Sequence, residues 1–212
     1  LDDRVVQRFN PEIAGRPQLV TGTSQILYRG MSGLTESSLL NIKNKSFAVT
    51  AELVIPADGA SGVVISQGGH HAGWAIYLLE GVPYYTHNSI GLNEYTVSGE
   101  QTIPEGTRQL RVEFDYDGGG ISKGGTATLY VDGDPAGQGR VEHTVGIIFA
   151  TDETTTIGRD TSTVVTDAYG PSGQNDFTGD ISWIRLDVGD DAHDPDHYID
   201  PGERLKTVLA RQ

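Results

Sequence analysis

Three carboxylates at alternate positions, Glu113, Asp115 and Asp117, are the residues whose types and spacing come nearest to catalytic chemistry. Side chains at alternate positions of a β-strand share one face and stand about 6.5–7 Å apart. That spacing is close to the separation that glycoside hydrolysis uses between its two carboxyl groups. The alternative, which we favour, is a water-exposed strand face opposite an apolar one, the default for one side of an antiparallel sheet.

Two adjacent histidines, His70 and His71, lie in a glycine-rich stretch that leads into Trp74. Neighbouring side chains on an extended chain point in opposite directions, so this pair is poorly placed to chelate one metal ion. Glycines allow a ligand or a second domain to approach closely, and loops on rigid scaffolds often carry function. His70, His71 and Trp74 therefore form a candidate interdomain or substrate-rim loop, with a plain surface turn as the alternative.

Two segments near the C-terminus carry groups that metal ions bind. His193 and His197 have the i, i+4 spacing of a helical zinc pair, but Pro195 between them argues against a helix through both. The acidic segment 187–191 offers carboxylates for Ca²⁺ without the regular spacing of an EF-hand. We therefore assign no metal-binding residue.

Motifs of activated nucleophiles are missing from the sequence. It contains no Gly-x-Ser-x-Gly elbow, no phosphate-binding loop and no His-Glu-x-x-His helix. It also has no cysteine, which removes disulfides, thiolate zinc sites and cysteine nucleophiles from consideration. We predict no catalytic residue and no cofactor in this chain.

The negative net charge of the chain excludes some classes of binding partner. Acidic residues outnumber basic ones by 29 to 15 among 212 residues, and the formal net charge is −14. This charge argues against nucleic acid and against an anionic membrane surface, because both need a basic patch. No apolar run reaches membrane-spanning length and no signal peptide opens the chain. The compartment is left open, with a cytoplasmic location favoured over a secreted one, and the oligomeric state is left open as well.

The elements that must position these residues are strands. Apolar and polar residues alternate along several runs separated by turn residues, which predicts strands with one buried and one water-exposed face. Asp132-Gly133 is a strong hairpin signal. The fold class predicted is all-β, a concanavalin/laminin-G-like jelly-roll sandwich of antiparallel strands. The strands are expected at 25–28, 47–55, 62–67, 74–79, 83–87, 94–98, 110–116, 126–131, 154–157 and 181–188.

The chain divides into three parts. Residues 1–17 are a linker or entry segment, 18–190 the β-sandwich domain, and 191–212 a C-terminal loop and closing helix. The helix is expected because Asp200-Pro201-Gly202-Glu203 has the pattern of a capped helix start, followed by an apolar stripe at Leu205, Val208 and Leu209. The chain starts at Leu1 without Met, so we expect a longer N-terminal part to precede it.

Several stretches resemble the segment that follows the catalytic domain in large bacterial arylsulfatases. The resemblance covers nearly the whole chain, although single pieces such as the Asp-Gly hairpin occur widely. The stretches are Arg8-Phe9-Asn10-Pro11, Ala14 to Leu19, Leu39 to Ser46, Phe114 to Gly120, Leu129 to Gly133, Tyr169-Gly170-Pro171, Pro201 to Arg204 and Ala210-Arg211-Gln212.

The resemblance implies a non-catalytic C-terminal domain. Arylsulfatases hydrolyse sulfate monoesters with a formylglycine, made from Cys or Ser in a Cys/Ser-x-Pro/Ala-x-Arg motif, and with Ca²⁺ held by Asp and Asn. Neither feature maps onto this chain, and Asp2 and Asp3 lie in the entry segment. The parent enzyme is thus implied to use Ca²⁺ and formylglycine. This chain would have the N-terminal catalytic sulfatase domain of the same polypeptide as its partner.

Three functions follow as expectations. The first is an accessory domain that packs on an arylsulfatase catalytic domain and shapes its substrate pocket with the His70–Trp74 loop. The second is a lectin-like module that binds glycan, including sulfated carbohydrate, through exposed aromatic residues. The third is a jelly-roll glycosidase that uses Glu113 and Asp117, on a segment that faintly resembles the Glu-x-Asp-x-Glu strand of β-glucanase-type hydrolases. The aromatic candidates for the second are Tyr84, Tyr85, Tyr95 and Trp183.

Overall fold

Alternation of apolar and polar residues produces eleven strands in the part of the chain that the computed structural model describes, residues 19–161, 163–200 and 202. All ten predicted strands are present, and their ends differ from prediction by a few residues. The strands are β1 (Ser24–Leu27), β2 (Phe47–Ile55), β3 (Gly62–Gly68), β4 (Gly73–Leu79), β5 (Val82–Ser89), β6 (Asn93–Ser98), β7 (Gly106–Tyr116), β8 (Gly125–Val131), β9 (Asp134–Val141), β10 (Thr155–Ile157) and β11 (Asp180–Val188). Among the described residues, three short 3-10 helices lie between or after the strands: η1 (Glu36–Ser38), η2 (Asp167–Tyr169) and η3 (Gly189–Ala192).

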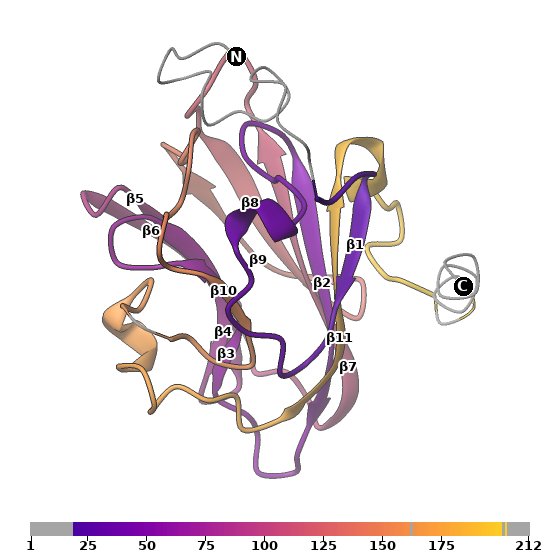
Figure 1. Cartoon of the computed structure of the whole chain (residues 1–212). Helices are drawn as coiled ribbons and strands as arrows, with labels where there is room; N and C mark the ends of the chain where they lie inside the picture. The colour runs from indigo at the N-terminus through magenta and orange to yellow at the C-terminus, as the bar shows by residue number, and fades with distance from the viewer. Residues whose placement is uncertain (1–18, 162, 201, 203–212) are drawn as a thin grey trace.

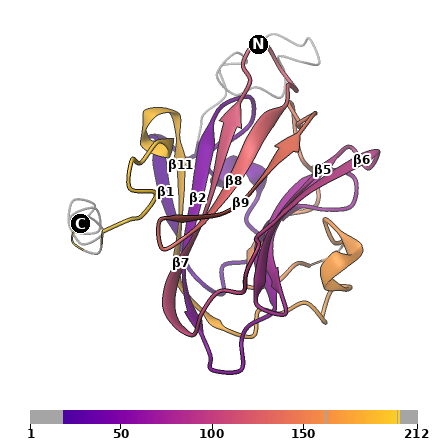
Figure 2. The ribbon, with the colours of Figure 1, turned by 180° about the vertical axis from the view of Figure 1, so that it is seen from behind.

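The strands form two antiparallel sheets that pack face to face. One has six strands in the order β1-β11-β2-β7-β8-β9, and the other has five in the order β10-β3-β4-β5-β6. Figures 1 and 2 show the six-stranded sheet on one side of the molecule and the β3–β6 strands on the other. The chain therefore folds as a two-layer sandwich, as the strand spacing predicts.

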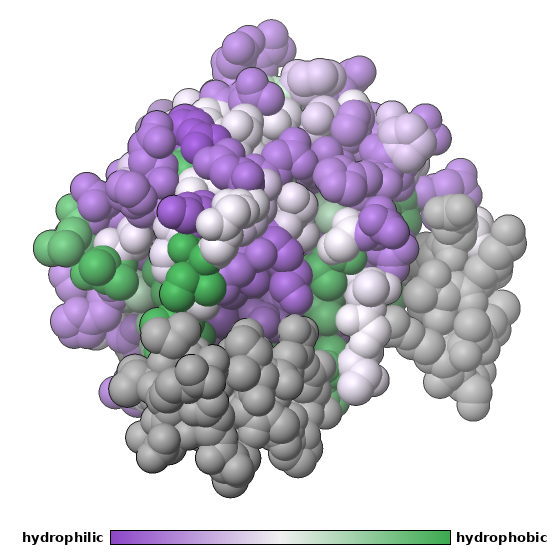
Figure 3. Space-filling model, turned by 90° about the horizontal axis from the view of Figure 1, so that it is seen from above, coloured by the Kyte–Doolittle hydropathy of each residue, from purple (hydrophilic) through white to green (hydrophobic). Residues whose placement is uncertain are grey.

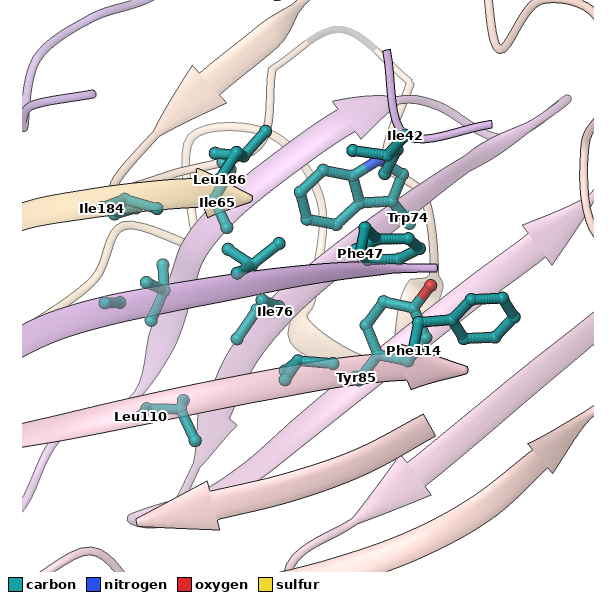
Figure 4. Packing of buried hydrophobic residues seen from close by; sticks show 14 of the residues in the cluster. Ile42, Phe47, Ile65, Trp74, Ile76, Tyr85, Leu110, Phe114, Ile184 and Leu186 are labelled. Atoms are coloured by element: carbon teal, nitrogen blue, oxygen red, sulfur yellow. The ribbon is translucent and has the colours of Figure 1, made fainter. Parts of the chain in front are cut away.

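The core lies between the inner faces of the sheets. β2 and β7 pair in register, with Phe47 opposite Phe114, and their rings stack at 5.2 Å between centroids. Trp74 of β4 meets Phe47 from the other sheet at 6.5 Å. Figure 4 shows these rings together with aliphatic side chains of both layers. Burial of this apolar surface is the main stabilising term of the sandwich.

The outer face of β2 and β7 is also covered, which corrects the prediction of a water-exposed face. Arg111 and Thr50 are both 0% exposed. The segment 189–200 crosses this face: Gln109 exchanges two hydrogen bonds with the backbone of Ile199, at 2.8 and 2.9 Å, and the Arg111 guanidinium donates to Ala192 O at 2.7 Å. Polar strand residues are buried here because they pair with a segment about 80 to 90 positions later in the chain.

A second long segment, described at residues 158–161 and 163–178, covers part of the outer face of the five-stranded sheet. It carries Asp160, which is 2% exposed and accepts hydrogen bonds from the Tyr169 hydroxyl and from Val165 N. Burial raises the pKa of the Asp160 carboxyl, and these hydrogen bonds act in the opposite direction. The segment, drawn in orange in Figure 1, packs against β3 and β4, and it also contacts β5 at Asn88 and β6 at Glu94.

One strand was missed and one prediction lies outside the described residues. β9 has the sequence Asp-Pro-Ala-Gly-Gln-Gly-Arg-Val, without an apolar alternation. It forms the edge of its sheet, where proline and glycine are tolerated in a strand. The predicted closing helix lies outside the described residues except for Gly202, whose N–H donates to Asp200 Oδ1 at 2.6 Å.

His87 makes stability depend on pH. Its ring is buried on the inner face of β5, where Nε2 accepts a hydrogen bond from Val145 N at 3.2 Å. Burial lowers the pKa of His87 from 6.5 to about 4. Between pH 6.5 and about 4 the histidine is protonated in the unfolded chain but stays neutral in the folded chain. The free energy of unfolding therefore falls as the pH decreases through this range, by about 3 kcal/mol in all.

The measurement is denaturant unfolding at a series of pH values for the wild type and for His87→Gln. The difference between the two proteins isolates the histidine, because buried carboxyls such as Asp160 titrate in both. The wild type is expected to lose stability toward pH 4 more steeply than the variant. Parallel pH profiles would contradict the assignment.

Candidate functional site

The predicted loop around His70 and His71 separates into an exposed and a buried part. Both histidines are exposed, and their ring centroids lie 6.0 Å apart. Trp74 is 1% exposed, lies in the core, and donates from Nε1 to Gln67 Oε1 at 2.7 Å. Trp74 therefore cannot line a substrate rim, because its side chain lies on the core-facing side of β4 and not in the exposed loop.

The three predicted carboxylates divide according to their partners. Arg111 donates to Glu113 at 2.6 Å, and His197 Nδ1 lies 2.9 Å from the same oxygen. Asp117 forms an ion pair with Arg140, which lowers the pKa of the Asp117 carboxyl. Asp115 is exposed. Both carboxylates that the glycosidase alternative requires, Glu113 and Asp117, are thus held in ion pairs. Glu113 is also only partly exposed, whereas the sequence predicted a fully water-exposed strand face.

Two of the predicted groups near the C-terminus, His197 and Asp187, have structural partners, and His193 is exposed. His197 stacks on Tyr130 at 4.0 Å and contacts Glu113, while Asp187 is fully buried and accepts from Arg185 Nε at 2.7 Å. Burial raises the pKa of the Asp187 carboxyl. In the described part of the chain, no three His, Cys, Asp or Glu side chains are grouped so as to hold a metal ion. The described part of the chain also contains no helix that is long and apolar enough to cross a membrane.

The four aromatic candidates for ligand stacking lie in different environments. Tyr85 and Trp183 are buried, at 0% and 3% exposure, and are not available to a ligand. Tyr95 is half-buried and packs against the main core. Tyr84 is half-buried on the outer face of β5, outside that core. Tyr84 is therefore the candidate that the structure places at a surface.

Tyr77 covers one face of the Tyr84 ring, and the edge strand β6 lies on its other side. Its ring stacks on Tyr77 of β4 at 5.2 Å between centroids, with 7° between the planes, and Tyr169 meets Tyr77 edge-on from the covering segment. On its other side Tyr84 pairs with Ser98 of the edge strand β6. Serine is short and Tyr84 is only half-buried, so we infer that the second face of the Tyr84 ring, above Ser98, accounts for its exposure.

Polar side chains continue from this ring along the same face. Thr96 and Glu94 follow Ser98 at alternate positions of β6 and are exposed. Thr96 hydrogen-bonds Thr86 at 2.8 Å, and Glu94 accepts from Thr166 Oγ1 at 2.7 Å. These bonds fix the side chains on a rigid strand while leaving further donor and acceptor capacity. We call Tyr84, Glu94, Thr96 and Ser98 the Tyr84 face.

The Tyr84 face could have been found from the sequence only in part. The alternation of 94, 96 and 98 predicts one shared strand face. The pairing of β5 with β6, which sets Ser98 opposite Tyr84, requires the register of the hairpin. The stacking of Tyr77 on Tyr84 depends in turn on β4.

Comparisons with known proteins give structural neighbours. No protein-family model and no curated protein matches the sequence. The carbohydrate-binding module CBM40 of a Ruminococcus gnavus IT-sialidase, solved bound to α2,6 sialyllactose, matches with a TM-score of 0.50 and 13% identity over 85% of this chain and 96% of that one. The NanB sialidase of Streptococcus pneumoniae matches with a TM-score of 0.51 and 17% identity over 84% of this chain and 27% of that one. The mouse laminin α1 domains LG4-5 match with a TM-score of 0.44 and 16% identity, over 81% of this chain and 40% of that one.

The chain has the fold that the sequence predicts. Its two antiparallel sheets form a concanavalin/laminin-G-like sandwich, and the CBM40 module superposes over nearly its whole length. At such identities the similarity concerns the fold, because sandwiches of this kind carry unrelated functions.

Proposed function

We propose that this domain binds glycans and that the Tyr84 face is its binding surface. The observation that carries the proposal is the half-buried ring of Tyr84, which is held parallel to Tyr77 and lies beside the short side chain of Ser98. The apolar face of a pyranose ring stacks on such an aromatic surface, and a stacked contact contributes about 0.5–1.5 kcal/mol beyond burial of area. The name of the CBM40 neighbour, a carbohydrate-binding module, supports the same class of ligand.

The polar residues of the Tyr84 face supply hydrogen bonds. Sugar hydroxyls donate to the Glu94 carboxylate and exchange hydrogen bonds with the Thr96 and Ser98 hydroxyls, all on one side of β6. The carboxylate of Glu94 repels sulfate and carboxylate groups. We therefore assign neutral sugars as ligands, in place of the sulfated carbohydrate that the sequence alone suggested.

The test is affinity electrophoresis of the chain in gels that contain neutral polysaccharides, with Tyr84→Ala as the variant. Loss of the stacking surface is expected to weaken binding by about tenfold, since a factor of ten corresponds to about 1.4 kcal/mol. Tyr28→Ala is the matched control, because Tyr28 is 45% exposed and lies beyond β1 on the other sheet. Equal retardation of the wild type and Tyr84→Ala would exclude the Tyr84 face as the site.

The second candidate function is a C-terminal accessory domain of an arylsulfatase. The resemblance of several stretches to that family supports it, and so does the exposure of His70 and His71, which leaves both imidazoles available to a neighbouring catalytic domain. The two functions are compatible within one polypeptide. Sequencing the reading frame upstream of Leu1 tests the arylsulfatase candidate, because it requires a Cys/Ser-x-Pro/Ala-x-Arg motif there.

A further inference from the structure

The hairpin between β5 and β6 presents two large apolar side chains to solvent. Ile90 is 62% exposed and Leu92 is 77% exposed, the latter being the highest exposure among the large hydrophobic residues that the structure describes. The N–H of Leu92 donates to Ser89 O at 3.2 Å and closes a turn with Ile90 and Gly91 at its centre. Figure 3 shows apolar atoms, in green, gathered at the side of the molecule to which β5 and β6 extend in Figure 1.

Ile90 adopts a backbone conformation that its side chain disfavours. Its φ is +52° and that of Gly91 is +68°, so both central residues of the turn are left-handed. Turns of this type take Asn-Gly or Asp-Gly, because a β-branched side chain clashes with its own backbone at positive φ. Isoleucine at this position lowers the stability of the fold in two ways: its backbone is strained, and its apolar side chain is exposed to water. At these exposures, contacts within the sandwich bury only the smaller part of either side chain.

The turn is held in place by one buried side chain. Asn88 is 4% exposed, and its Oδ1 accepts from Gly91 N at 2.9 Å. Its Nδ2 donates at 3.0 Å both to His70 O and to Val165 O. These bonds join the hairpin to the histidine loop and to the covering segment. Ile90, Leu92, His70 and His71 therefore form one rigid surface, which we call the hairpin tip.

Two acidic residues, Asp152 and Glu153, lie near the histidine part of the hairpin tip. Asp152 is exposed, and Glu153 lies against Gly69 at the base of the histidine loop, where a Cβ atom on Gly69 would come within 2.1 Å of Glu153 Oε2. Burial raises the pKa of the Glu153 carboxyl, the charge of Asp152 adds to this effect, and the nearby histidines oppose it. An anionic membrane or nucleic acid is repelled by such a rim, and two copies of this chain would bring like charges together.

We propose that the hairpin tip docks into a protein partner that offers an apolar socket flanked by Lys or Arg side chains. Branched aliphatic groups fill such sockets, whereas they offer a sugar neither a flat ring nor a hydrogen bond. Basic groups on the partner complement the carboxylates of Asp152 and Glu153. This docking surface adjoins the Tyr84 face on the same hairpin but shares no residue with it, and it does not depend on glycan binding.

The first experiment measures the cost of Ile90 in the chain alone. Ile90→Asn places the residue that the turn prefers and is expected to raise the melting temperature by about 2–4 °C, the shift that corresponds to ~1 kcal/mol in a domain of this size. Ile121→Asn is the matched control, because Ile121 is 48% exposed but is not among the residues with positive φ, and it is expected to give no rise. A lower melting temperature for Ile90→Asn would overturn the proposal, since Ile90 would then stabilise the fold itself.

The second experiment identifies the partner and measures its affinity. A photoreactive residue at position 92 is introduced in the producing cells, and the crosslinked protein is purified and titrated with the wild type, Ile90→Asn and Asp152→Lys. The proposal expects at least a tenfold loss of affinity for Ile90→Asn and a weaker complex for Asp152→Lys. Crosslinks confined to lipid or to other copies of this chain, the absence of any crosslink, or equal affinities would each overturn it. Binding of neutral sugars serves as the internal control, because it tests the Tyr84 face independently.

Discussion

Replacing Phe114 by alanine is expected to lower the free energy of unfolding by about 3–5 kcal/mol, the usual cost of a buried Phe→Ala change. Phe114 is 2% exposed and stacks on Phe47 across the β2–β7 pair, so truncation leaves a cavity at the centre of the sandwich. Close packing around Phe47 and Trp74 limits how far the core can collapse into that cavity.

Asp115→Ala is the control for this experiment. Asp115 is the next residue on β7, points to the other side of the sheet and is exposed. Its replacement is expected to change stability by less than about 0.5 kcal/mol. Chemical denaturation of both variants measures the difference. Losses of similar size would mean that the faces of β7 are assigned the wrong way round.

Arg111→Ala is the second large effect, at about 3–5 kcal/mol. The guanidinium of Arg111 is 0% exposed and holds three partners: Glu113 at 2.6 Å, Thr50 Oγ1 at 2.8 Å and Ala192 O at 2.7 Å. Removing it leaves a poorly hydrated carboxylate and an unpaired carbonyl under the segment 189–200. Denaturant unfolding should show the loss, and hydrogen exchange should show that this segment opens first.

Arg140→Ala provides the comparison for Arg111. Arg140 also pairs with a carboxylate, Asp117, but both side chains are more than 40% exposed. An ion pair in water contributes little because solvent screens it. The Arg140 variant should therefore unfold at nearly the same denaturant concentration as the wild type. If Arg111→Ala were equally mild, the buried network would not hold the segment 189–200 in place.

Sequence patterns predicted the inner layer of the sandwich well. The alternation at 47–55 and at 110–116 correctly identified Phe47, Leu53 and Phe114 as core residues. A strand with a single apolar face must turn that face toward the core, because the opposite register would expose all of its apolar side chains. The edge strand β9 was missed because its exposed, glycine-rich sequence has no such alternation.

The outer faces were predicted less well. Arg111 and Gln109 have the appearance of solvent-facing residues, yet they are buried by partners at 192 and 199. Trp74 was correctly predicted to begin the strand at 74–79, but it was also included in the candidate rim loop, although strand pairing with β3 places it inside. Long polar connections that fold back over a sheet carry no periodic signal, so their contacts cannot be inferred from local sequence.

The most direct test of glycan binding is an NMR titration of the chain with neutral oligosaccharides, following tyrosine ring signals and backbone amides. The account predicts saturable shifts at the Tyr84 ring and at the amides of Thr96 and Ser98, with the Tyr28 ring unchanged. Saturable shifts elsewhere, or no shifts at the Tyr84 face with any neutral sugar, would contradict the assignment of this face as the binding surface.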